Sequence, residues 1–157
     1  MDNDMKRSII LDNYQDAKNR GIPTNASNYI KINSNNQSCI DNIDIYIKLD
    51  NDLISDIKFE GEACVIAISS TSILSNMLIG KTINEAREIL SNYFNMIEEG
   101  KYNKEILGEA LVYEDMYKQP SRKTCATLFA RGICNLFNES EKKDWLCFYY
   151  MIYFFKF

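Results

Sequence analysis

Four residues of this sequence could together hold a metal ion or supply a nucleophile: Cys39, Asp41, Cys64 and Cys125. The thiolate is both the nucleophilic and the metal-binding form of cysteine. Three thiolates and one carboxylate make a tetrahedral donor set that suits zinc. No compact C-x-x-C pair is present, so three independent buried cysteines are the alternative that the spacing leaves open.

The absence of histidine narrows the chemistry further. The chain of 157 residues contains none, so Ser-His-Asp and Cys-His catalysis within the chain are excluded. Zinc fingers with histidine ligands and H-E-x-x-H metalloproteases are excluded for the same reason. The protein ligands of any metal must be Cys, Asp or Glu, or must come from a partner.

The composition is that of one globular domain. Hydrophobic residues make up 46% and charged residues 25% of the chain, which is enough to build a core. The net charge of −4 and the lack of a long basic block argue against a nucleic-acid partner. The acidic N-terminus is unlike a signal peptide, and no segment reaches the roughly 18 apolar residues of a membrane span. With an odd total of five cysteines, these features predict reduced thiols and a cytoplasmic location.

A β-hairpin is predicted between Cys39 and Cys64. Apolar and polar residues alternate over 43–49, DND at 50–52 forms the turn, and 57–59 begin the return strand. A hairpin brings the chain back to the end at which it started. Cys39 and Cys64 should therefore be neighbours at one end of the sheet, with Asp41 pointing to the same place.

The remaining elements are mostly helical and follow the strands, which predicts an α+β fold. The patterns predict a first strand at 29–33, a loop with a short helix at 98–118, and helices at 7–21, 64–80, from Thr82 onward, and 122–137. Thr82 and Glu85 form a capping-box pattern, and Gly80 is a C-terminal cap signal. Cys64 and Cys125 would both lie near helix N-termini, whose partial positive charge stabilises a thiolate.

The C-terminal segment is unusually apolar. Residues 141–157 contain WLCFYYMIYFFKF, which is too short to span a bilayer. We expect residues 1–140 to form the domain, and the extension to pack on it or on a second copy in a homo-oligomer. An interfacial membrane contact is the alternative. Cys134, on an apolar helical stripe, and Cys147, in the extension, are predicted to be core or interface cysteines.

Four stretches occur in the order found in one known family. ILDNYQDAKNRG, SCID, IKFEGEACVIAISSTSILSNMLIGKT and PSRKTCATL resemble the IscU/NifU N-terminal family of iron–sulfur cluster assembly proteins over roughly residues 6–135. Within this family the chain resembles the SufU branch. IscU proteins have a histidine where Thr124 precedes the third cysteine, and they carry an L-P-P-V-K motif that is missing here. Arg122 in PSRKTCA is a SufU-like feature.

The resemblance implies a fold, a metal and a partner. The fold would be a small antiparallel sheet of about three strands packed against several helices. Zinc would be held by Cys39, Asp41, Cys64 and Cys125, and Arg122 would steady the thiolate site. A SufS-type cysteine desulfurase would form a persulfide, and one of its histidines would take over a zinc position. Cys39, freed on its loop, would then accept the sulfur for SufBCD-type cluster assembly machinery.

Two glycines that are usual in the family are replaced in this sequence. The replacements lie beside the first two cysteines, so functions other than sulfur transfer stay open. Ile40 stands between the first cysteine and the aspartate, and Ala63 precedes the second cysteine. A β-branched residue does not readily take positive φ, so Ile40 predicts a stiffer loop and less efficient transfer. The alternative functions are a scaffold on which a [2Fe–2S] cluster is assembled, and a zinc-stabilised binding module without transfer activity.

Overall fold

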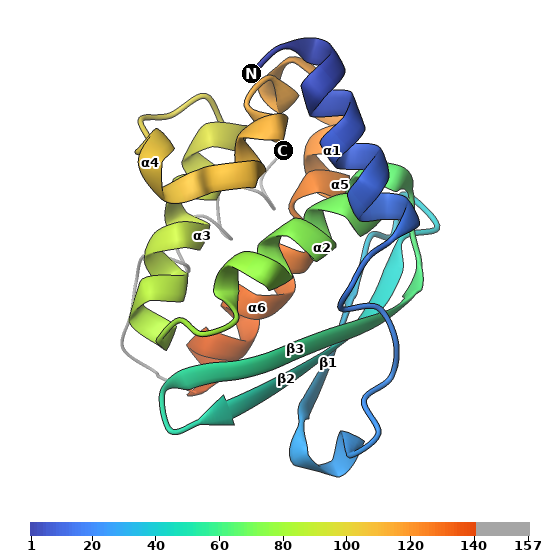
Figure 1. The fold of residues 1–157 in the computed structure, drawn as a ribbon, viewed down its shortest axis with the longest axis vertical. Helices are drawn as coiled ribbons and strands as arrows, with labels where there is room; N and C mark the ends of the chain where they lie inside the picture. Colours follow the sequence, from blue (N-terminus) through green and yellow to red (C-terminus); the bar gives the residue numbers. More distant parts are fainter. Residues whose placement is uncertain (141–157) are drawn as a thin grey trace.

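The computed structural model of this chain describes residues 1–140. The predicted extension at 141–157, with Cys147, lies outside the described residues, so its role and the boundary at residue 140 stay predictions. A three-stranded antiparallel sheet lies on one side of the molecule, and helices cover one of its faces (Figure 1). The predicted α+β class is confirmed.

The sheet is a simple meander in the order β1-β2-β3. Its strands are β1 (Ile30–Asn35), β2 (Asn42–Asp50) and β3 (Leu53–Glu62). Ile43, Ile45 and Ile47 alternate along β2 and are fully buried, as their period of two predicts. Because the strands are antiparallel, the last residues of β1, the first of β2 and the last of β3 lie at the same end of the sheet. Asn42 pairs there with both Asn35 and Glu62.

The helices form the second layer. They are α1 (Asn3–Gln15), α2 (Val65–Leu78), α3 (Ile83–Ile97), α4 (Lys104–Leu107), α5 (Pro120–Ala126) and α6 (Leu128–Ser140). α2 runs through the middle of the layer and contacts α1, α5 and α6 (Figure 1). The predicted capping box of α3 is present, with the Thr82 and Glu85 side chains each bonded to the other's backbone N–H. α1 begins earlier than predicted, because Asp2 caps it, and ends at Gln15 instead of running on to Gly21.

The segment predicted as a loop with a short helix at 98–118 contains that short helix, α4, and more helical structure than expected. α4 is followed by two 3-10 turns, η2 (Gly108–Tyr113) and η3 (Met116–Lys118). Leu107, Ala110 and Tyr113 are fully buried there. The apolar residues follow no single helical period, so the pattern concealed how much of this segment belongs to the core.

The helix predicted at 122–137 is in fact two helices. It breaks at Thr127, whose Oγ1 donates a hydrogen bond to the Lys123 carbonyl at 2.8 Å. α5 packs against α2, α6 and η3, and this tertiary packing overrides the continuous apolar period. The prediction that Cys125 lies near a helix N-terminus is therefore wrong, since Cys125 is in the last turn of α5.

One glycine allows the strands to close tightly beside Asp41. Gly61 has φ +140°, and a Cβ built on it would lie 2.9 Å from the Ile43 Cα and still nearer the Asn42 carbonyl. L-residues rarely adopt this conformation, and no backbone shift is available between paired strands. Arg20 also donates from Nη2 to the Gly61 carbonyl at 2.8 Å. Gly61 thus keeps the ends of β2 and β3 close together.

An ion-pair network joins α1 to the segment that precedes α5. Lys6 Nζ lies 2.8 Å from both Glu114 Oε1 and Asp115 Oδ2, and Lys118 Nζ lies 2.8 Å from Asp115 Oδ1. Hydrogen bonds from Lys118 and Lys6 lower the pKa of Asp115 from 3.8 to about 2. The network therefore favours the ionised carboxylate in the folded state.

Asp115→Asn should lower the free energy of unfolding at neutral pH by no more than about 1 kcal/mol, because this carboxylate is half exposed. The folded-state pKa is below the unfolded one, so the contribution is present above pH 3.8 and is lost as the pH falls toward 2. Urea unfolding of the unmodified protein and of Asp115→Asn, between neutral pH and pH 2, measures this contribution to the free energy of unfolding. The two stabilities should converge in acid; a constant difference would contradict the assignment. Asp12→Asn is the control, because Asp12 is exposed and pairs with no cation among residues 1–140.

Candidate metal and thiol site

The site lies at the end of the sheet where β1 ends, β2 begins and β3 ends. Cys39 is exposed in the turn between β1 and β2, and the Asn36 N–H closes the base of this turn on the Asp41 carbonyl at 2.9 Å. Cys64 follows β3 directly. The predicted placement of Cys39, Asp41 and Cys64 at one end of the sheet is therefore observed, and its cause is the antiparallel meander.

Asp41 is the hub of the cluster and is only 1% exposed. Its Oδ1 accepts the backbone N–H of Cys64 at 2.8 Å, and its Oδ2 lies 3.7 Å from the Cys64 Sγ. One carboxylate oxygen is thus used to hold the start of α2, and the other faces the sulfur. A buried carboxylate needs such partners, because desolvating a charge is costly.

Cys64 is the N-cap of α2, as predicted. Its Sγ accepts the Ala67 N–H at 3.4 Å. The sulfur thus takes up one of the N–H groups of the first turn of α2, which have no partner within the helix.

Cys125 is contributed by α5 and is 4% exposed. Burial raises the pKa of its thiol, and contacts with Asp41 and Cys64 raise this pKa further. A carboxylate oxygen of Asp41 and the sulfur atoms of Cys39 and Cys125 all lie within 4.8 Å of one another. The structure therefore brings all four predicted residues together, three in one compact group and Cys64 through its contacts with Asp41 and Cys125.

The donor set fits zinc. A zinc–sulfur bond of about 2.3 Å places two sulfur ligands of a tetrahedral site about 3.8 Å apart. The Cys64 Sγ lies 3.7 Å from the Asp41 Oδ2, and the donor atoms of Cys39, Asp41 and Cys125 lie within 4.8 Å of one another, so small shifts would bring these donors onto one ion. Three sulfur atoms and one oxygen are donors that zinc accepts readily.

The two arginines near Cys125 differ in their surroundings. Arg122 is exposed, makes no ion pair with a residue in 1–140, and lines a cleft of about 650 Å³ that borders Cys64. Arg131 is on α6 and donates from Nη2 to the Thr124 carbonyl at 2.9 Å. Burial lowers the pKa of Arg131, and the charge of Cys125 opposes this. Arg131 could not be singled out from the sequence, because a basic residue one helix beyond the cysteine belongs to no motif.

Ile40 does not strain the turn. Within the described part of the chain, Asn51 and Glu99 are the non-glycine residues with positive φ. Ile40 therefore has an ordinary backbone conformation, and its side chain is 79% exposed beside Cys39. A stiffer loop was expected because Ile40 would have to take a positive φ. Since its φ is not positive, that reason does not apply.

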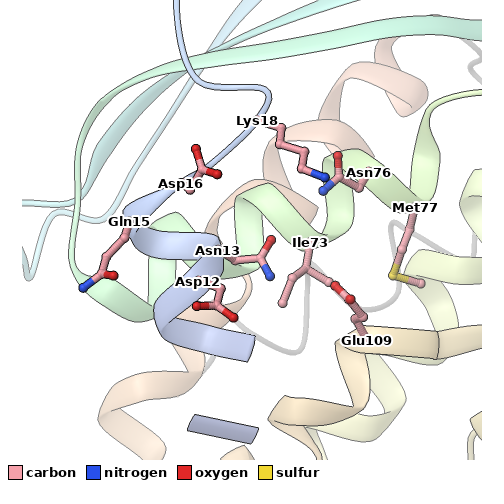
Figure 2. A pocket seen from close by; sticks show the side chains of 9 residues that line it. All are labelled: Asp12, Asn13, Gln15, Asp16, Lys18, Ile73, Asn76, Met77 and Glu109. Carbon is pink, nitrogen blue, oxygen red and sulfur yellow. The ribbon is translucent and has the colours of Figure 1, made fainter. Parts of the chain in front are cut away.

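A second cleft lies between α1 and α2 and is separate from the cysteines. It has a volume of about 540 Å³, and its labelled residues include Asp12, Asp16 and Glu109 around Ile73 (Figure 2). Asn13 lies on its α1 side, where its amide donates to the Ile9 carbonyl and its Oδ1 accepts from Ser72 at 2.8 Å. Asn13 thus ties α1 to α2, and the cleft shares no residue with the cysteine cluster.

The sequence profile of the NifU-like N terminal domain matches residues 5–126, which include all four clustered residues. The chain belongs to the NifU-like N-terminal domain family. The predicted resemblance and the IscU/SufU-like fold are confirmed.

Individual relatives support the SufU branch of the NifU-like family. The chain is 34% identical to the zinc-dependent sulfurtransferase SufU of Bacillus subtilis, over 78% of this chain and 82% of that protein. It is 38% identical to the iron–sulfur cluster assembly scaffold protein IscU of Streptococcus pyogenes, over 60% of each chain. The crystal structure of FiSufU from Fervidobacterium islandicum AW-1 superposes with a TM-score of 0.73 and 32% identity, over 80% of this chain and 90% of that one.

Membership of this family places the chain among iron–sulfur cluster assembly proteins. Within residues 1–140, no helix is both long and apolar enough to cross a membrane.

Proposed function

We propose that this protein is a zinc-dependent sulfurtransferase that accepts persulfide sulfur from a SufS-type cysteine desulfurase. The observation that carries this proposal is the contrast within the cluster. Cys39 is exposed on a turn, whereas Asp41 and Cys125 are buried and Cys64 caps a helix. One thiol can therefore reach a partner while the other donors stay in place. The similarity to a protein named for this activity supports the proposal.

Cys39, Asp41, Cys64 and Cys125 would hold the metal. Bound zinc would keep the thiols deprotonated and, having no redox chemistry, would leave a persulfide intact. The chain supplies no histidine, so any imidazole ligand would come from the desulfurase.

The transfer itself is a thiol–disulfide-type exchange at Cys39. The Cys39 thiolate attacks the outer sulfur of the persulfide on the desulfurase cysteine. A sulfur–sulfur bond forms at Cys39, the bond from the outer sulfur to the desulfurase cysteine breaks, and that cysteine leaves as a thiolate. The persulfide on Cys39 is then available to SufBCD-type machinery in the cytoplasm.

The test is alanine release by a SufS-type cysteine desulfurase with cysteine and a reductant. Zinc-loaded protein should stimulate release strongly, and protein stripped by a chelator should not until zinc is restored. No stimulation by the zinc-loaded protein would overturn the proposal. Protein denatured and added at the same concentration controls for nonspecific effects.

A [2Fe–2S] scaffold is the second candidate, because the IscU relatives carry that name and the site has three thiols. Thr124 weighs against it, since its hydroxyl donates to the Ser121 carbonyl and is not a usual iron ligand. Anaerobic reconstitution with iron and sulfide distinguishes the two. A stable chromophore with no desulfurase stimulation would favour the scaffold.

A further inference from the structure

Cys64 and Cys125 belong to different helices. These helices must keep a fixed separation for both sulfur atoms to bind one metal ion. Cys64 caps α2, and Cys125 lies in the last turn of α5. The two helices pack against each other near the site. Two buried tyrosines, Tyr113 and Tyr93, each form a hydrogen bond with one of these helices.

Tyr113 is bonded to the first half of α2. Its hydroxyl lies 2.5 Å from the Ser69 Oγ, and both residues are fully buried. Ser69 also donates to the Ile66 carbonyl at 3.3 Å. Each hydroxyl can donate or accept, so the bond can run in either direction. This bond anchors the turn of α2 that follows Cys64.

Tyr93 is bonded to the end of α5. Its hydroxyl donates to the Ala126 carbonyl at 2.7 Å, and Tyr93 is also fully buried. Ala126 follows Cys125 directly, and its carbonyl is among the last of α5, which lack partners within the helix. This bond anchors the turn that carries Cys125.

The two tyrosines contact each other. Their ring centroids are 6.4 Å apart with an interplanar angle of 88°, an edge-to-face arrangement. The two hydrogen bonds therefore belong to one packed unit that links α2 to α5. The turn that carries exposed Cys39 is not part of this unit.

We propose that Tyr93 and Tyr113 are positioning residues of the metal site: their hydroxyls hold α2 and α5 at the separation that places Cys64 and Cys125 on one metal ion. The inference rests on the proposed zinc-dependent function. The proposal predicts that Cys64 and Cys125 keep fixed positions while Cys39 can move. Sulfur transfer through Cys39 requires this arrangement.

The test measures zinc affinity of the full chain by competition with a chromophoric chelator. Tyr93→Phe and Tyr113→Phe keep the rings and remove one hydroxyl each, and each should raise the dissociation constant about tenfold or more. The Co²⁺-substituted variants should also show altered thiolate charge-transfer and d–d bands. Tyr29→Phe is the matched control, because its hydroxyl bonds to Asp56 outside the cluster; it should leave both measurements unchanged.

The outcomes separate this inference from the function it rests on. If the unmodified protein binds no zinc, the proposed function and the inference both fail. If it binds zinc and the variants match it in affinity and cobalt spectrum, the inference alone fails. Variants that lose thermal stability without metal but keep affinity would also overturn it. Ser69→Ala removes the same bond from the other side, should Tyr113→Phe not fold.

Discussion

Replacing Cys39 with serine should reduce alanine release by the desulfurase to the rate of the desulfurase alone. The serine hydroxyl is a far weaker nucleophile than a thiolate near neutral pH, and it cannot carry a persulfide. Cys39 is exposed in a turn, so the fold should not change. Mass spectrometry after a single turnover should find a persulfide on the unmodified protein and none on the variant.

Cys134→Ala is the control for general effects of losing a cysteine. Cys134 is 1% exposed in α6, as its place on an apolar stripe predicts. Removing its sulfur should cost some stability and leave the stimulation in place. If the Cys39→Ser variant still stimulates the desulfurase, then Cys39 is not the sulfur acceptor. That result would support the zinc-stabilised binding module without transfer activity.

Replacing Asp41 with asparagine should weaken zinc binding by at least about 100-fold, beyond the usual effect of a residue that only supports a ligand. Asparagine keeps the shape and can still accept the Cys64 N–H through Oδ1. The charged oxygen that faces the Cys64 sulfur becomes an amide, which donates instead of ligating. Chelator competition measures the change in affinity.

Asp44→Asn is the matched control, because Asp44 lies in β2, the strand that follows Asp41. Asp44 pairs with Lys31 at 3.4 Å and accepts from Asn33, away from the cysteines. Its replacement should leave zinc affinity unaltered. If Asp41→Asn also binds zinc normally but unfolds more readily, then Asp41 only holds the start of α2 and is not a ligand.

The strands could be predicted because their signal is local. Residues 43–49 have one buried face and one polar face, and a period of two follows directly from strand geometry. The hairpin then requires Cys39, Asp41 and Cys64 to share one end of the sheet. The family resemblance rests on the same short motifs, and the sequence profile confirms it.

The helix that carries Cys125 could not be delimited in this way. The apolar pattern continues across Thr127, so nothing in its period marks the break. The Thr127 side chain bonds to Lys123 in the folded chain, and the packing of α5 against α2 and α6 favours two helices. The propensity of one threonine is too weak a signal for such a boundary.

The donor types, the hairpin and the exclusion of histidine chemistry could be read from the sequence, because they depend on residue identity and on short-range spacing. The folded structure was needed to show that Asp41 is buried against Cys64 and that Arg131, Tyr93 and Tyr113 bond to the helices of the site. Most of these are contacts between residues distant in the chain, and burial and hydrogen-bond partners exist only once the helices have packed on the sheet.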